Sequence, residues 1–108
     1  MTPLQIYALT LSLMQAPADL PPPVVEILPA GSIPRNVGEY VTGTVRAEDD
    51  ACLQITLAHE FSHSIAIRTG RLAGVPNQKV KARLEQIARD VERRWPRFMP
   101  NCQTDPTP

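Results

Sequence analysis

Two histidines and a glutamate lie close together in the middle of the chain, in a pattern that can bind a metal ion and activate water. His59, Glu60 and His63 belong to the stretch His-Glu-Phe-Ser-His, so the two imidazoles are four residues apart. On a helix this spacing places both rings on one face, about one turn apart. Zn²⁺ binds neutral imidazole nitrogens at about 2.0–2.1 Å. We therefore predict that His59 and His63 bind one Zn²⁺ per chain, with Glu60 as the general base that takes a proton from water.

The alternative is that these histidines are ordinary core residues, because a short pattern of this kind also arises by chance. His59 and His63 are the only histidines in the chain. They fall at ligand spacing, with a carboxylate directly after the first of them. We therefore favour metal binding.

The stretch from Thr56 to Ile65, Thr-Leu-Ala-His-Glu-Phe-Ser-His-Ser-Ile, resembles the active helix of the zincin metallopeptidases. The zincins that continue this motif with Gly and a third His are excluded, because Ala66 and Thr69 occupy those positions. The chain is instead similar to the gluzincins, whose third zinc ligand is a Glu on a following helix, and in size to the minigluzincins. The segment Leu84–Ala88 resembles their glutamate helix, which implies Glu85 as the third ligand.

The residues alone leave other third ligands open. Glu92 lies seven residues after Glu85 and therefore on the same flank of a helix, so periodicity does not separate the two. Asp90, Cys102 or no third protein ligand are the remaining possibilities. In larger relatives a second carboxylate often lies four residues after the ligand Glu, but Arg89 occupies that position here.

The resemblance implies a zinc-dependent endopeptidase acting on a peptide or protein substrate, with an edge strand that holds the substrate extended. Some minimal zincins are latent zymogens, and a Cys102 thiolate could block the zinc as a fourth ligand. We favour free thiols or a disulfide between Cys52 and Cys102, the latter especially if the protein is exported. The alternative function is a non-catalytic, structural zinc-binding protein of phage or mobile-element type.

The elements that must position these residues indicate an α+β fold. Thr2-Pro3 predicts the start of a helix over 3–15. An apolar run ending at Thr69-Gly70 predicts the active helix over 51–69. Asn77 as cap and Pro96 as stop predict the glutamate helix over 77–95. Strands are expected over 24–28 and 39–47, with Gly43 as a bulge or a point of close approach, in a two- or three-stranded sheet.

Length and composition fit one domain over residues 1–96, followed by an irregular tail over 97–108. The 108 residues carry 11 basic and 11 acidic side chains, but residues 61–108 hold nine of the basic ones. Much of this charge lies on the glutamate helix without interleaved aromatic residues, so we do not expect a nucleic-acid partner.

The first eighteen residues resemble an export signal but lack its basic start, so we favour a packed helix there. Every apolar run falls short of the roughly 18–20 residues that a membrane span needs. We expect a soluble protein with no membrane partner and favour the cytoplasm over secretion. The oligomeric state stays open.

Overall fold

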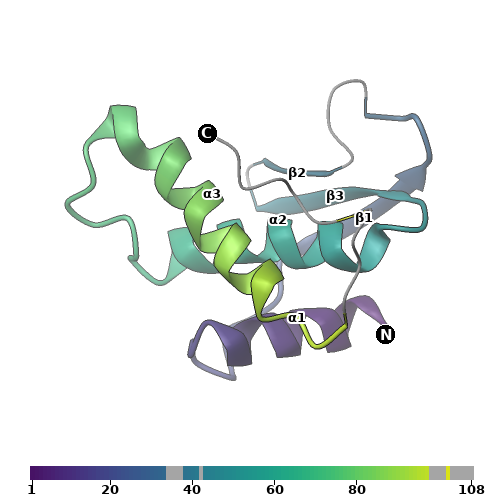
Figure 1. Cartoon of the computed structure of the whole chain (residues 1–108), viewed down its shortest axis with the longest axis horizontal. Helices are drawn as coiled ribbons and strands as arrows, with labels where there is room; N and C mark the ends of the chain where they lie inside the picture. The colour runs from purple at the N-terminus through teal and green to yellow at the C-terminus, as the bar shows by residue number, and fades with distance from the viewer. Residues whose placement is uncertain (34–37, 42, 98–101, 103–108) are drawn as a thin grey trace.

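The computed structural model describes residues 1–33, 38–41, 43–97 and 102. Within this part of the chain, three helices and three strands form the α+β fold that the sequence predicts (Figure 1). In chain order they are α1 (Pro3–Leu13), β1 (Val24–Pro29), β2 (Gly38–Val41), β3 (Thr44–Asp49), α2 (Leu53–Arg68) and α3 (Asn77–Arg93). Of the tail expected over 97–108, only Arg97 and Cys102 are described.

The first helix, α1, begins where the sequence predicts. The Thr2 hydroxyl accepts the Gln5 backbone N–H, while the Gln5 side chain accepts the Thr2 backbone N–H, which forms a capping box. Ile6, Tyr7 and Leu11 are buried on one face, and the Tyr7 ring meets Phe61 of α2 edge-on at 5.2 Å between centroids. α1 is therefore part of the core.

The sheet has three strands in the order β1-β3-β2. β3 pairs in parallel with β1 and antiparallel with β2. The single strand predicted over 39–47 is wrong, because this segment folds back as the hairpin of β2 and β3. Gly43 lies between the two strands with φ +84°, a conformation that glycine adopts without steric cost, so it permits a reversal rather than a bulge.

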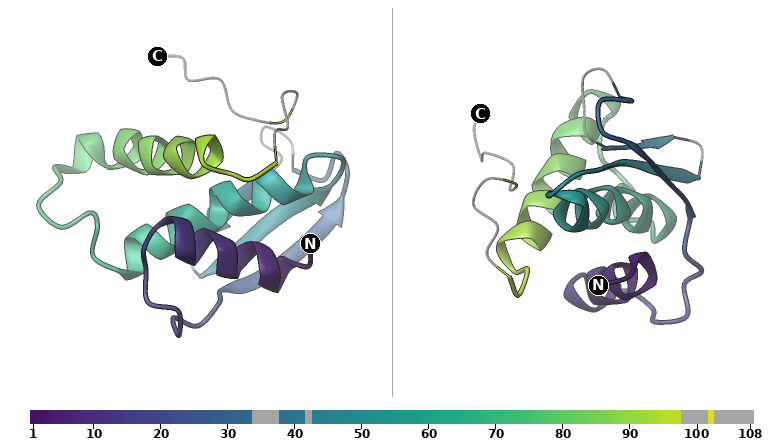
Figure 2. Two further views of the ribbon diagram at one scale, coloured as in Figure 1. Left: turned by 60° about the horizontal axis from the view of Figure 1, so that its bottom comes forward. Right: turned by 90° about the vertical axis from the view of Figure 1, so that its right-hand side faces the viewer.

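The second helix, α2, lies at the centre of the fold. The right-hand view of Figure 2 shows it end-on, with α1, the sheet and α3 on three sides. Phe61, Leu57 and Ile65 are fully buried, and Val45 and Ala47 of β3 join them in one core. A helix that buries residues around most of its circumference, as α2 does, is stable only when other elements surround it in this way.

The third helix, α3, lies obliquely across α2 (Figure 1). It buries Ala88, Val91 and Glu92 on the side that faces α2 and exposes the opposite face, as expected for an amphipathic helix. Asn77 is its first residue and not the predicted cap, since Pro76 occupies the cap position. Trp95 follows the helix and remains buried, donating its indole N–H to the Gln54 side chain at 2.8 Å. In the described part of the chain, none of the helices is both long and apolar enough to span a bilayer.

Candidate metal centre

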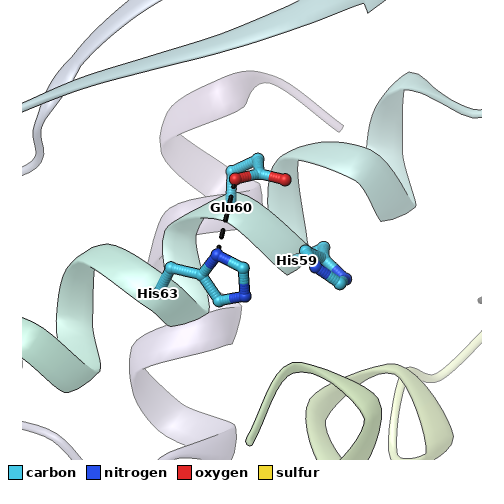
Figure 3. Close-up of side chains that lie close together, drawn as sticks. All are labelled: His59, Glu60 and His63. Carbon is cyan, nitrogen blue, oxygen red and sulfur yellow. Dashed lines mark ion pairs between the residues drawn. The ribbon is translucent and has the colours of Figure 1, made fainter. Parts of the chain in front are cut away.

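His59, Glu60 and His63 all come from the middle of α2, as predicted (Figure 3). The two imidazole rings lie edge-to-face with centroids 4.6 Å apart. Nitrogen or oxygen atoms of all three side chains lie within 4.8 Å of one another. The helix alone therefore brings together two candidate metal ligands and one candidate base.

The crossing of α3 over α2 adds Glu85 to this pair of histidines. The Nε2 atoms of His59 and His63 each lie 3.3 Å from a Glu85 carboxylate oxygen. Ligands at about 2.0–2.1 Å from a tetrahedral zinc ion are themselves separated by about 3.3–3.4 Å. Each of the two nitrogens is thus spaced from the Glu85 carboxylate as two ligands of one zinc ion are spaced from each other.

His63 provides a second test of whether these residues fit a metal. Its Nε2 atom is buried and has no hydrogen-bond partner among the described residues, although a Glu85 oxygen lies 3.3 Å away. A buried nitrogen without a hydrogen bond is costly, and a metal ion among the three side chains would remove that cost. The donor set fits zinc, which accepts both imidazole and carboxylate ligands.

Glu92 contacts a different atom of the same site. Its side chain is only 4% exposed, and one carboxylate oxygen lies 3.1 Å from Nδ1 of His59. A hydrogen bond at Nδ1 leaves Nε2 as the free lone pair and fixes the ring plane. Glu92 is therefore placed to orient His59, whereas Glu85 faces the nitrogens that would bind the metal.

From the sequence, Glu92 is only an alternative metal ligand, and Arg89 occupies the position where a second carboxylate is expected. The signal that could have identified it was the seven-residue spacing from Glu85, which keeps both carboxylates on one flank of α3.

Glu60 lies on the other side of the histidine pair from Glu85. It is 7% exposed, and its carboxylate is 3.6 Å from Nδ1 of His63 (Figure 3). Glu60 therefore contacts the ring nitrogen that does not face Glu85. This leaves Glu60 beside the site as a candidate proton acceptor. Glu85 is the carboxylate that lies near both imidazoles.

The three carboxylates change the pKa of His59. Burial disfavours the charged ring, but the Glu92 hydrogen bond and the charges of Glu60, Glu85 and Glu92 outweigh it, so the pKa is raised. The site thus favours a cation, and a proton competes with a metal ion at His59.

Two other candidate ligands are excluded by their contacts. Cys102 forms a disulfide with Cys52, which rules out the thiolate block of the zinc. Of the two favoured alternatives, the disulfide is confirmed and the free thiols are not. Asp90 forms ion pairs with Arg93 and Arg94 at the surface.

Comparison with known proteins identifies no relative of this chain. No protein-family model, curated protein sequence or solved structure matches it. The resemblance to the gluzincins therefore depends on the motif on α2 and on the carboxylates that α3 brings to it.

Proposed function

We propose that this protein is a zinc-dependent metallopeptidase that hydrolyses peptide bonds in a peptide or protein substrate. The observation that carries the proposal is the position of Glu85, whose carboxylate reaches Nε2 of both His59 and His63. Three protein ligands with one position left for water are typical of catalytic zinc sites, whereas structural sites usually have four protein ligands.

Each side chain has a separate task in this reaction. Bound zinc would supply a Lewis acid that polarises the peptide carbonyl and lowers the pKa of water. Glu60 accepts the proton from water and returns it to the leaving amine. Glu92 holds the His59 ring through Nδ1.

The sheet offers a place for an extended substrate. β2 is an edge strand and contacts α2, which carries Glu60. A peptide added to an open sheet edge gains main-chain hydrogen bonds whatever its side chains. We propose β2, rather than the whole segment 39–47, as the strand that holds the substrate.

A structural zinc site is the second candidate function. The histidines come from α2 and the carboxylates from α3, so a bound ion would also join two helices that are otherwise packed only through side chains. Binding energy of this kind stabilises the fold directly. The two functions differ in whether Glu60 has a chemical task.

The disulfide between Cys52 and Cys102 indicates the kind of cellular compartment in which the protein functions. Disulfides persist in oxidising compartments and are rare in the cytosol. We propose an oxidising compartment, which reverses the preference for the cytoplasm drawn from the sequence.

The test measures zinc per chain by elemental mass spectrometry and cleavage of a mixed peptide library by mass spectrometry. The variants are Glu60→Gln, His63→Ala and Glu85→Gln, with Glu26→Gln on the exposed strand β1 as the matched control. Glu60→Gln should keep its zinc and lose about 10²- to 10⁴-fold in cleavage rate. His63→Ala and Glu85→Gln should lose zinc and activity together.

Each other outcome has a distinct meaning. Near one zinc per chain without cleavage by the wild type, and with Glu60→Gln unchanged in zinc content and stability, supports the structural role instead. No zinc in the wild type after reconstitution contradicts both functions.

A further inference from the structure

The outward face of α3 carries two adjoining hollows that the metal centre does not use. One has a volume of about 550 Å³ and lies where the loop after α2 enters α3. The other, of about 240 Å³, lies between α3, Arg71 of that loop and Met14 at the end of α1. Arg83 and Gln86 line both hollows, so the two lie side by side along α3 and are here together called the basic groove.

The basic groove is strongly positive, although the chain as a whole is neutral. Its lining contains five cationic side chains and a single carboxylate, Asp90. The cations are Lys79, Arg83, Arg71, Arg93 and Arg94. Such a field attracts anionic ligands and repels cationic ones.

Much of this charge is available to a ligand. Within the described part of the chain, Arg83 and Lys79 have no hydrogen-bond or ion-pair partner. Arg93 and Arg94 share Asp90, but all three side chains are about half exposed or more, at 66%, 47% and 49%. Exposed ion pairs contribute little stability, so an incoming carboxylate can replace Asp90 at small cost.

The basic groove lies on the other side of α3 from the metal centre. Arg83 precedes Glu85 by two residues, which on a helix turns the side chain by about 200°. Arg83 and Asp90 share one flank in the same way that Glu85 and Glu92 share the opposite one. Occupation of the basic groove is therefore independent of the proposed metal.

The chemistry of the lining selects the kind of anion. Guanidinium groups bind carboxylates through paired hydrogen bonds. None of the residues that line the two hollows is aromatic, whereas proteins that bind single-stranded nucleic acid stack bases on aromatic side chains. From Lys79 to Arg94 α3 rises about 22 Å, a distance that an extended peptide of about seven residues spans.

We propose that the basic groove binds an acidic segment of a polypeptide, whose Asp or Glu side chains pair with Arg83 and its neighbours. Such a segment of a partner protein would dock away from the metal centre.

Fluorescence anisotropy with a labelled peptide of alternating Glu and Gly tests this proposal on the full-length chain in EDTA. The wild type should bind it, and added salt should weaken the binding. Arg83→Glu should weaken it about five- to tenfold, because it replaces attraction with repulsion in both hollows. Lys81→Glu is the matched control, since it makes the same charge change on the exposed surface of α3 but lines neither hollow.

The proposal is supported if Arg83→Glu loses affinity, Lys81→Glu keeps it and Arg83→Lys restores most of it. Equal losses in Arg83→Glu and Lys81→Glu would mean that only net charge matters, and would overturn the proposal. So would an absence of binding at low salt, or tighter binding of a single-stranded oligonucleotide of equal charge. Because EDTA is present throughout, these outcomes do not depend on the metal centre.

Discussion

His59 lies between two carboxylates that contact opposite nitrogens of its ring. Glu85 faces Nε2 and Glu92 faces Nδ1. In metal sites the carboxylate on the outer nitrogen fixes the tautomer and makes the ligand more basic. The two glutamates of α3 are therefore expected to have different tasks, which their substitutions should separate.

We predict that Glu92→Gln lowers zinc affinity about 10- to 100-fold without abolishing binding, because the ring of His59 loses its charged partner. Competition with a chromophoric chelator measures this affinity. Asp90→Asn, also on α3 but at the surface, is the control and should bind zinc as the wild type does. Unchanged affinity in Glu92→Gln would show that Glu92 does not position His59.

The raised pKa of His59 predicts how zinc and pH act together. In the metal-free protein, protonated His59 adds to the free energy of unfolding because its pKa is higher in the folded state than in the unfolded state. This contribution is fully present below the ordinary pKa of 6.5. It is lost as the pH rises through the folded-state pKa of His59. Zinc binds only the neutral ring, so the increase in Tm caused by zinc should grow over the same rise in pH. Thermal unfolding with and without zinc, over a series of pH values, measures it. A zinc effect independent of pH would contradict the prediction.

At the scale of the elements, the end of β3 holds the segment that follows β1. The Glu48 carboxylate accepts the backbone N–H groups of Gly31 at 2.9 Å and Ile33 at 2.8 Å. These two hydrogen bonds favour the charged form and lower the pKa of Glu48. One side chain thus joins β1 to β3 beyond their strand pairing.

We predict that Glu48→Gln lowers Tm at neutral pH, because an amide offers one acceptor oxygen where the carboxylate offers two. The contribution of Glu48 is present above its unfolded pKa and is lost as the pH falls through the lower folded-state pKa. The difference in Tm between wild type and variant should therefore shrink in acid. Glu26→Gln, on the exposed part of β1, should leave Tm nearly unchanged, and an equal effect of both substitutions would argue against a specific role of Glu48.

At the scale of the whole molecule, one disulfide closes a loop around the entire metal centre. Cys52 precedes α2 and Cys102 follows α3, at a sequence separation of 50. All of His59, Glu60, His63, Glu85 and Glu92 lie within this loop. The cross-link therefore reduces the number of conformations open to the unfolded chain between the two cysteines. This segment contains all residues of α2 and α3, which must meet to form the site.

We predict that the double variant Cys52→Ser, Cys102→Ser unfolds with a free energy about 2–4 kcal/mol lower than the wild type, from the entropy of closing this loop. Denaturant titration measures the difference. A thiol reductant should destabilise the wild type and leave the double variant unaffected. Equal stability of the two oxidised proteins would show that the disulfide does not hold the fold together.

Much of the local structure was predictable because its causes are local. The cap at Thr2, the apolar run of α2 and the stripe on α3 act through neighbours along the chain, and all three helices form within a few residues of their expected bounds. The spacing of His59 and His63 likewise follows from helix periodicity once α2 exists.

Only the tertiary structure decided those features that depend on contacts between residues far apart in the sequence. Strand 39–47 became a hairpin because β3 pairs with β1 on one side and with β2 on the other. Cys52 and Cys102 meet because the chain after α3 returns to the start of α2. Glu85 and Glu92 share one helical flank, so only the place where α3 crosses α2 determines which carboxylate faces Nε2 and which faces Nδ1 of His59. Such contacts depend on where two packed elements cross, and that information is absent from the periodicity of either element alone.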